Sequence, residues 1–388
     1  MMRNVYLQIT PFFPSESDFR GAYIFDQVQA IKDNSNYQVV VIKVLSLFDK
    51  GDTKPYLYQG IYVYPFKVID LPFAIIPGFF KPLNTFRLLR FFKSKLNISL
   101  DDIAKVHAHV SYPAGQLASA ITVNDKKIQS YIQHHGLDVL QLENGRFLKG
   151  VFKKINQAYI KYRSIKSLNE VDLNIGVSQK VIDELKNISD NKSSKYYVLY
   201  NGVNRNKFFK VNNIKKSDKF TIGCIANFWP LKDQITLLKA LQLLNDSNVF
   251  IKFIGTGPTL HNCQAFVQDN YLEKQVEFLS EIDHSQLNQF YNSLDLFVLP
   301  SFYEAFGCVY AEALTVGVPI IAVKGQGIEE ILTESDKTKL LIRKGDAVGL
   351  SEKIIAMKNT PETINYNLDI NVYIKGFLKK TTENRPNL

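Results

Sequence analysis

The sequence predicts an α/β protein with two doubly wound parallel-sheet domains that face each other. First, 388 residues are more than one ordinary core organises. Second, short apolar runs rich in β-branched residues alternate with helical patterns in both halves, which is typical of parallel sheets covered on both faces. Third, the polar stretch 204–219 separates two such series. Ligands bind beyond the carboxyl ends of such strands, so we expect a cleft between the domains.

The first domain is expected over residues 1–204 and opens with a strand at 4–9. Its further strands are predicted at 37–45, 61–66, 106–110 and 173–178, with helices at 23–32 and 181–186. The second domain is expected over residues 205–365. Its strands are predicted at 220–227, 249–255, 276–280, 295–301 and 319–323, with helices at 233–244, 284–294 and after Phe306.

Composition narrows the class of protein. With 46% apolar and 22% charged residues the chain is expected to be globular. It contains no run of about 18 apolar residues, the length needed to span a bilayer. The N-terminus lacks a signal-peptide pattern. The three cysteines, Cys224, Cys263 and Cys308, lack metal-ligand spacing and are expected to be free thiols in a reducing cytosol.

The net charge of +10 is spread unevenly. Residues 1–204 hold 26 basic against 17 acidic side chains, whereas residues 205–388 hold 21 against 20. The first domain is therefore expected to lie near a negatively charged partner.

Residues 304–312 read EAFGCVYAE and follow the predicted strand 295–301. Phe306 and Gly307 are expected at the start of a helix, where unpaired N–H groups and the helix dipole form an anion site. With Glu304 and Glu312 on either side, the stretch suits a nucleotide sugar, whose diphosphate meets the helix and whose hydroxyls meet the acids. An ordinary strand-turn-helix with solvated acids explains this stretch equally well.

The surrounding residues resemble the retaining glycosyltransferases of family four, which have the GT-B fold. Glu304 and Glu312 fit the family's E-x7-E hallmark, within a similarity that spans DLFVLPSFYEAFGCVYAEALTVGVPIIAV. The segments IGCIANFWPLKDQITLLKAL, PFFPSESDFRGAYIFDQVQAI and VLYNGVNRNKF are also similar to the family, as is the turn Gly327–Glu330. In GT-B proteins the tail crosses back onto the first domain, and we expect this of residues 366–388.

The resemblance implies a role for each matching residue. Glu312 would bind the ribose, Glu304 the transferred sugar, Lys232 the departing diphosphate, and His135 the donor sugar. The other implied donor-binding residues are Gly21, Asn227, Phe306, Gly307 and Cys308, the last as a small apolar filler. In this family the leaving phosphate is thought to activate the incoming hydroxyl on the same face, so no nucleophilic carboxylate is assigned.

No cofactor and no metal are expected, because the chain has no Asp-x-Asp motif. Fixed positive charge and backbone amides would stabilise the leaving group instead. Many relatives carry an arginine where this chain has Asn227, so the second cation either comes from elsewhere, with Arg205 and Arg20 as candidates, or is missing.

The histidines are weighed separately. His135 is the functional candidate and His109 is expected to line the cleft. His107 is expected to face away from His109 and pack in the core, and His134 is interpreted as structural. A zinc site is the lesser alternative, because zinc requires three or four converging ligands.

Two acid-free stretches carry the surplus charge. Residues 71–100 hold five basic residues and six phenylalanines, and residues 145–169 hold seven basic residues. A helix is expected with Leu88, Leu89, Phe92 and Leu96 on one side and Arg87, Arg90 and Lys93 on the other. This pattern suits an anionic membrane surface and an acceptor bound near it. The alternative is that the apolar side packs on the first sheet and the basic side is merely solvated.

The sequence thus predicts a cytoplasmic enzyme, peripheral on the inner face of the cell membrane. It would move a sugar from a UDP- or GDP-linked donor to a saccharide acceptor, lipid-linked, in cell-surface polysaccharide or glycoconjugate synthesis. A nucleotide-sugar epimerase or phosphorylase on the same scaffold is the alternative enzyme. A basic nucleic-acid-binding protein is a third reading, but the chain contains no recognised binding module.

Overall fold

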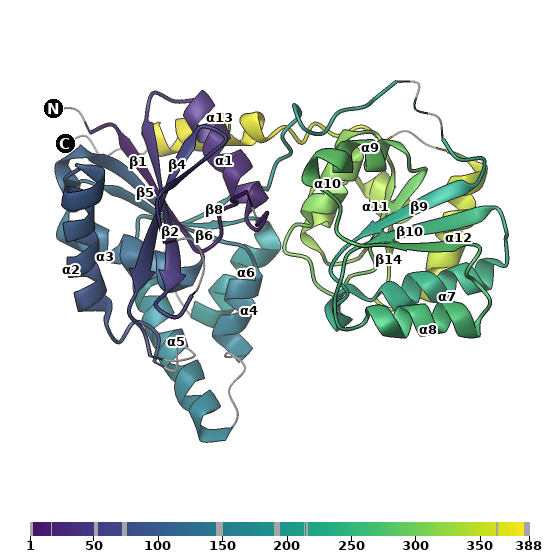
Figure 1. The fold of residues 1–388 in the computed structure, drawn as a ribbon, viewed down its shortest axis with the longest axis horizontal. Coiled ribbons are helices and arrows are strands. Elements are labelled where there is room, and N and C mark those ends of the chain that lie inside the picture. The colour runs from purple at the N-terminus through teal and green to yellow at the C-terminus, as the bar shows by residue number, and fades with distance from the viewer. Residues whose placement is uncertain are drawn as a thin grey trace. The chain divides into compact units, whose positions relative to one another are not determined.

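The computed structural model shows two compact α/β units (Figure 1). One comprises residues 1–201 with 371–388, and the other residues 202–370. The residues that the structure describes are 3–16, 18–49, 53–71, 76–144, 150–189, 195–212, 214, 216–361 and 364–383. Both units carry a parallel sheet with helices, which confirms the predicted fold class.

The first unit contains an eight-stranded sheet in the order β3-β4-β2-β1-β5-β6-β7-β8. Its strands are β1 (Val5–Thr10), β2 (Gln38–Ser46), β3 (Tyr56–Tyr58), β4 (Ile61–Val68), β5 (Ile103–His109), β6 (Gln129–His134), β7 (Leu173–Gly176) and β8 (Tyr196–Val198). Among the described strand pairs, only the edge pair β3–β4 is antiparallel. The chain runs outward in opposite directions from β1 and β5, so the topological switch point, where such sheets bind ligands, lies between these two strands.

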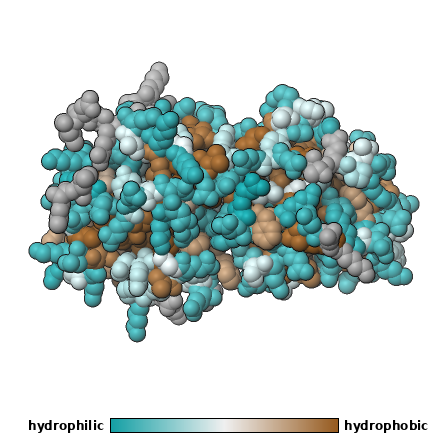
Figure 2. Space-filling model, turned by 90° about the horizontal axis from the view of Figure 1, so that it is seen from above, coloured by the Kyte–Doolittle hydropathy of each residue, from teal (hydrophilic) through white to brown (hydrophobic). Residues whose placement is uncertain are grey.

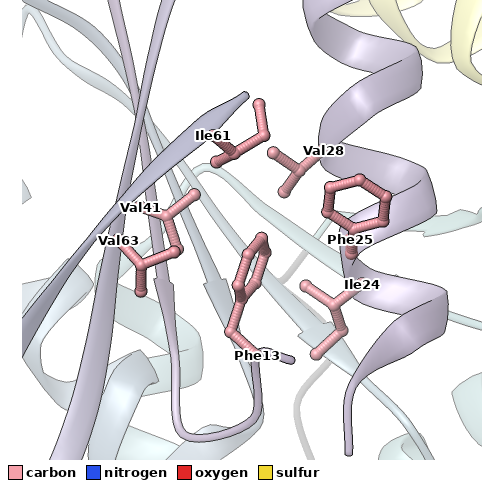
Figure 3. Packing of buried hydrophobic residues seen from close by; sticks show 7 residues of the cluster. All are labelled: Phe13, Ile24, Phe25, Val28, Val41, Ile61 and Val63. Atoms are coloured by element: carbon pink, nitrogen blue, oxygen red, sulfur yellow. The ribbon is translucent and has the colours of Figure 1, made fainter. Parts of the chain in front are cut away.

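Helices cover this sheet. They are α1 (Ala22–Asp33), α2 (Lys81–Phe91), α3 (Gln116–Asn124), α4 (Leu137–Asn144), α5 (Gly150–Glu170), α6 (Gln179–Ser189) and α13 (Ile370–Glu383). Figure 3 shows how α1 packs on the sheet, with Val28 pointing toward Ile61 and the ring of Phe13 lying between Ile24 and Val63. All of these side chains are almost fully buried, and that burial fixes the helix that begins after Gly21.

Helix α13 belongs to the first unit although it ends the chain. Phe377 packs on His107 and Tyr131, with ring centroids 5.8 and 5.5 Å apart. Lys105 Nζ, almost fully buried, donates to Thr381 Oγ1 at 2.9 Å. The described part of the tail therefore packs on the first sheet through both apolar contacts and a buried hydrogen bond.

The second unit has six parallel strands in the order β11-β10-β9-β12-β13-β14. They are β9 (Phe220–Ile225), β10 (Val249–Ile254), β11 (Val276–Leu279), β12 (Leu296–Val298), β13 (Ile320–Val323) and β14 (Leu341–Ile342). Its helices are α7 (Gln234–Leu244), α8 (Leu260–Asp269), α9 (Leu287–Asn292), α10 (Cys308–Thr315), α11 (Glu334–Leu340) and α12 (Ala347–Asn359). Its switch point lies between β9 and β12.

The polar stretch 204–219 is not a separate connector. Its described part belongs to the second unit, where the ring of Phe208 lies 5.9 Å from that of Tyr291 and Val211 N–H donates to Asn292 Oδ1. Buried Phe208 fixes this segment on α9, a contact that a largely polar stretch hides from pattern reading.

Candidate active site

The loops after β9 and β12 meet at the switch point of the second unit. Gly223 of β9 pairs with Phe297 of β12, so both strands end at the same edge. Beyond that edge Phe302 N–H donates to Leu231 O at 2.7 Å, and Ser301 Oγ donates to the same carbonyl at 3.1 Å. These bonds hold the turn that ends in Lys232 beside the segment that carries Glu304.

Lys232 and Glu304 form an ion pair, with Nζ 2.5 Å from Oε1. The side chains are only 25% and 12% exposed, so solvent screens the pair less than an open surface bridge. The backbone of Glu304 is also fixed, because its N–H donates to Gln326 Oε1 at 2.7 Å while Gln326 Nε2 donates to Phe302 O at 3.2 Å. Buried Gln326 thus holds the acid in place.

Gly307 is the N-cap residue of α10 and has a left-handed backbone conformation that few other residues adopt. Its φ is +86°, and a Cβ built on it would lie 2.4 Å from the ring of Tyr310. The buried Tyr310 donates its hydroxyl to Leu299 O at 2.5 Å, which ties the helix to the end of β12. The first amides of α10 therefore lie at the edge where Glu304 follows β12, with Phe306 buried just before them.

Glu312 lies on the second turn of α10, half-buried. Tyr291 of α9 donates its hydroxyl to Glu312 Oε2 at 2.7 Å. Burial, and then the charge of Glu312, raise the pKa of Tyr291 well above its usual value, so the hydroxyl stays a donor. Sequence reasoning missed Tyr291 because its partner is distant along the chain.

The two arginines considered for a second cation, Arg20 and Arg205, lie in different surroundings. Arg20 pairs with Asp18 at 2.8 Å within its own loop, while Asn227 and Arg205 are exposed. Lys344, just after β14, lies 4.2 Å from the ring centroid of Phe302 and so adjoins the segment of Glu304. Lys344 stands next to Arg343 after a two-residue strand, a pattern that carries no site signal, and its place near Glu304 is not predicted from the sequence.

In the first unit, Gly21 and the histidines gather at the carboxyl edge. Gly21 has a φ of +88°, and a Cβ there would lie 2.6 Å from Phe12 O, so only glycine fits. His135 follows β6, with its Nε2 3.0 Å from His109 Nδ1. His109 Nε2 lies 3.0 Å from Gln8 Oε1.

The expectation that His107 faces away from His109 is wrong. The two rings stack, with centroids 4.9 Å apart and planes 10° apart, because residues i and i+2 of a strand share a face. Burial lowers the pKa of His107 to about 3 and that of His135 to about 4, and it lowers the pKa of His109 well below its usual value. All three rings are therefore neutral near pH 7.

His134 points into a separate contact, with Nδ1 3.0 Å from Asp138 Oδ2. The backbone N–H of His135 donates to Asp138 Oδ1 at 2.9 Å, so one carboxylate orders both residues. Within the described ranges no three His, Cys, Asp or Glu side chains converge in a way that could hold a metal ion. Cys224 and Cys263 are buried free thiols, and Cys308 is half-buried at the start of α10.

Helix α2 differs from the predicted amphipathic helix in one respect. Leu88 and Phe92 are buried, as the alternative of an apolar side packed on the first sheet predicts, but Arg87 turns back onto the protein, where it donates to Lys67 O at 2.8 Å and lies 5.4 Å from the ring centroid of Phe66. Arg90 and Lys93 are exposed. Residues 72–75 and 145–149 of the two basic stretches lie outside the described residues.

The exposed side of α2 is apolar as well as basic. Phe79, in the turn before α2, and Leu83 and Phe86 of α2 are 54%, 43% and 63% exposed. Arg90 is exposed near the end of α2, and exposed Lys93 lies in the π-helix Phe92–Leu96 that follows it. We call these five residues the α2 stripe. On the face shown in Figure 2, apolar side chains are interspersed among polar ones. No described helix is both long and apolar enough to cross a membrane.

Comparison with known proteins supports this architecture. HepE of Anabaena, solved in complex with UDP, superposes with a TM-score of 0.72 at 16% identity, over 98% of this chain and 100% of that chain. It is a GT-B enzyme. A glycosyltransferase of Methanocaldococcus jannaschii is 27% identical over 68% of each chain. The alpha-monoglucosyldiacylglycerol synthase of Acholeplasma laidlawii is 23% identical over 89% of this chain and 88% of its own.

Fold and comparisons together define the class as GT-B glycosyltransferases. The family description "Glycosyltransferase Family 4" matches residues 21–207, and "Glycosyl transferases group 1" matches residues 204–370. The two matches follow one another along nearly the whole chain, and the chain belongs to this family of glycosyltransferases.

Proposed function

We propose that this glycosyltransferase moves a sugar from a nucleotide-sugar donor to a saccharide acceptor, with retention at the anomeric carbon. The observation that carries the proposal is the set of Lys232, Glu304 and Glu312 at the switch point of the second unit. Solved structures of a protein with a similar fold contain UDP and UDP-glucose, which supports a nucleotide sugar as the donor. The donor's diphosphate, sugar and ribose need a cation and two acids, and this edge supplies them.

The proposed mechanism stabilises the leaving group. Lys232 leaves Glu304 for the diphosphate as it departs, and the first amides of α10 add positive potential. Glu304 then accepts hydrogen bonds from the transferred sugar, while Glu312, held by Tyr291, accepts them from the ribose. The departing phosphate oxygen takes the proton of the incoming hydroxyl on the same face, so no carboxylate acts as nucleophile. Fixed charge takes the role that a divalent cation has in other transferases.

Lys344 is proposed as the second cation for the diphosphate. Its ammonium already lies on Phe302, beside the segment of Glu304, and its flexible stem lets it turn toward a bound phosphate. Lys344→Ala should weaken UDP binding, whereas Arg20→Ala, which removes a cation already paired with Asp18, should not. The opposite pattern would return the role to Arg20.

Thermal stabilisation by a panel of nucleotide sugars tests the donor class, because a ligand that binds only the folded state raises its stability. We expect one UDP- or GDP-sugar to raise the melting temperature, and Lys232→Ala to abolish the rise. Incubation with that donor alone then separates a transferase from an epimerase. An epimerase converts the donor without acceptor, whereas a transferase gives at most slow hydrolysis. Stabilisation by no nucleotide sugar would contradict the proposal.

The acceptor is proposed to be lipid-linked and reached at an anionic membrane surface, where the enzyme is peripheral on the cytoplasmic side. The α2 stripe places three exposed apolar side chains beside two exposed cations, which is the pattern of a helix that lies in a lipid interface. The Acholeplasma relative is named for a glycolipid product, which fits such an acceptor.

A further inference from the structure

A buried row of polar side chains crosses three strands at the carboxyl edge of the first sheet. Gln8 lies on β1, His109 on the neighbouring β5, and His135 directly after β6, which pairs with β5. Gln8 and His109 have no exposed surface. Two contacts of 3.0 Å join them, from Gln8 Oε1 to His109 Nε2 and from His109 Nδ1 to His135 Nε2. The row lies at the switch point between β1 and β5.

Hydrogen-bond chemistry gives this row a direction. An amide oxygen only accepts, so His109 Nε2 must carry the proton and donate to Gln8. A neutral imidazole has one ring proton, which leaves His109 Nδ1 as an acceptor. His135 Nε2 must then donate to it, and His135 Nδ1 is left as a bare lone pair. Burial keeps both rings neutral by lowering their pKa values, that of His135 to about 4.

Each end of the row has a buried atom without a partner in the described chain. These atoms are His135 Nδ1 and, at the other end, Gln8 Nε2. A buried acceptor without a partner is costly, and sites that keep one are commonly completed by a ligand or ordered water. The ring plane is itself held, because Tyr23 of α1 lies 5.1 Å from it, centroid to centroid. The lone pair therefore has a fixed direction.

We propose that Gln8 and His109 are positioning residues that hold His135 in one tautomer, so that its Nδ1 accepts a hydrogen bond from a hydroxyl of the bound sugar. A phosphate oxygen is a poor partner for this atom, because neither group then carries a proton. The inference rests on the proposed function for the identity of the ligand. The tautomer itself is a property of the folded chain.

Gln133 provides a matched comparison. It is as buried as Gln8 and lies beside His109 on β6, but its Oε1 accepts from Gln27 Nε2 at 2.7 Å. Replacing either glutamine with methionine keeps nearly the same volume and removes the amide. Only the change at Gln8 breaks the row.

Nitrogen-15 NMR of the full-length, histidine-labelled protein near pH 7 tests the tautomer without any donor. The chain has six histidines, and His135→Asn identifies the His135 signals. We expect an unprotonated Nδ1 and a protonated Nε2, and loss of this preference in Gln8→Met but not in Gln133→Met. A Gln8 amide turned the other way would reverse every role in the row. A protonated Nδ1 in the unaltered protein would therefore overturn the proposal.

Steady-state kinetics with the donor found by the panel test the consequence. We expect Gln8→Met to lower kcat/KM about tenfold, equivalent to about 1.4 kcal/mol, and Gln8→Glu, which keeps an oxygen acceptor, to restore most of it. Removal of the sugar hydroxyl that binds His135 should lower kcat/KM of the unaltered enzyme. The same deoxy-sugar donor should cause no further loss of kcat/KM in Gln8→Met, where that hydrogen bond is already lost. Equal kinetics for Gln8→Met and the unaltered enzyme would refute the positioning role. If no nucleotide sugar binds, the proposed function fails while the NMR result still stands.

Discussion

Lys232 Nζ lies 2.5 Å from Glu304 Oε1, so the cation proposed for the diphosphate and the acid proposed for the sugar neutralise each other when no donor is bound. The pair sits in partly buried surroundings, where an unpaired charge of either sign would be costly. In the proposed mechanism, Lys232 leaves this ion pair for the departing diphosphate, and Glu304 accepts hydrogen bonds from the transferred sugar instead.

Lys232→Ala should lower kcat/KM by about 10²- to 10³-fold, because it removes preorganised positive charge worth about 3–4 kcal/mol at the leaving group. The matched control is Lys216→Ala, which breaks the ion pair of Lys216 with Asp295, 2.8 Å apart in the same unit. Steady-state kinetics and UDP titration by calorimetry measure both variants. Near-normal turnover in Lys232→Ala, with its fold intact, would remove this residue from the mechanism.

Tyr291→Phe should weaken nucleotide binding about tenfold while leaving the sheet and α10 folded. The change removes the hydroxyl that donates to Glu312 at 2.7 Å, so the carboxylate that we propose binds the ribose loses the bond that orients it. Tyr366→Phe is the control, since Tyr366 also donates to a carboxylate, that of Asp336, in the same unit. Equal loss of UDP affinity in the two variants would show that Tyr291 acts through stability alone.

The site shows which parts of a sequence can be interpreted without a structure. Strand-turn-helix rules that act over a few residues place Glu304 before the turn, Gly307 in it and Glu312 on the helix, while the meaning of the spacing between the two acids comes from the family resemblance. Tyr291, Gln326 and Lys344 were missed because each reaches the site from a different element, and their contacts depend on the packing of the whole sheet. The fold class was predictable because the apolar strand pattern repeats in both halves.

The first unit shows the limits more sharply. The sequence shows that residues 71–100 are rich in phenylalanine but does not predict that the rings of Phe79 and Phe86 are exposed, because a helical pattern alone does not fix which side meets the sheet. Arg87 was assigned to the free side, yet it donates to Lys67 O, since its long stem can reach a neighbouring strand end. The prediction for His107 and His109 was wrong because it misapplied the two-residue period of a strand, which the sequence alone provides.

Membrane binding should depend on both the basic and the apolar side chains of the α2 stripe. Charge reversal at Arg90 and Lys93 should lower the affinity for anionic vesicles roughly 30-fold or more, at about 1 kcal/mol for each basic residue lost. Phe79→Ser with Phe86→Ser should lower it as well, through lost apolar burial. Co-sedimentation with vesicles of anionic and of neutral lipid measures both.

The control for charge is reversal of Lys239 and Lys274, which are exposed on the second unit and change the net charge equally. If this pair lowers vesicle binding as much as Arg90 and Lys93 do, the attraction is general and the α2 stripe is not its site. Unchanged binding after the two phenylalanine substitutions would mean that the stripe does not enter the lipid interface.

The stability of the first unit should fall as the pH falls below about 6.5, the ordinary histidine pKa. Burial holds the native pKa of His107 at about 3 and that of His135 at about 4, with that of His109 also well below the ordinary value. Between about pH 6.5 and 4 the unfolded chain therefore binds protons that the folded chain does not. Each fully buried imidazole then removes about 1.4 kcal/mol of unfolding free energy per pH unit.

The double variant Tyr6→Phe with His107→Phe isolates one of these imidazoles. Tyr6 Oη and His107 Nδ1 lie 3.0 Å apart, so replacing both removes a hydrogen bond without stranding either partner, and the new ring still packs on Phe377. Urea unfolding at several pH values should show an acid slope about one proton shallower than in Tyr6→Phe alone, which keeps the imidazole. Identical slopes would mean that His107 takes up its proton in the folded protein as readily as in the unfolded one.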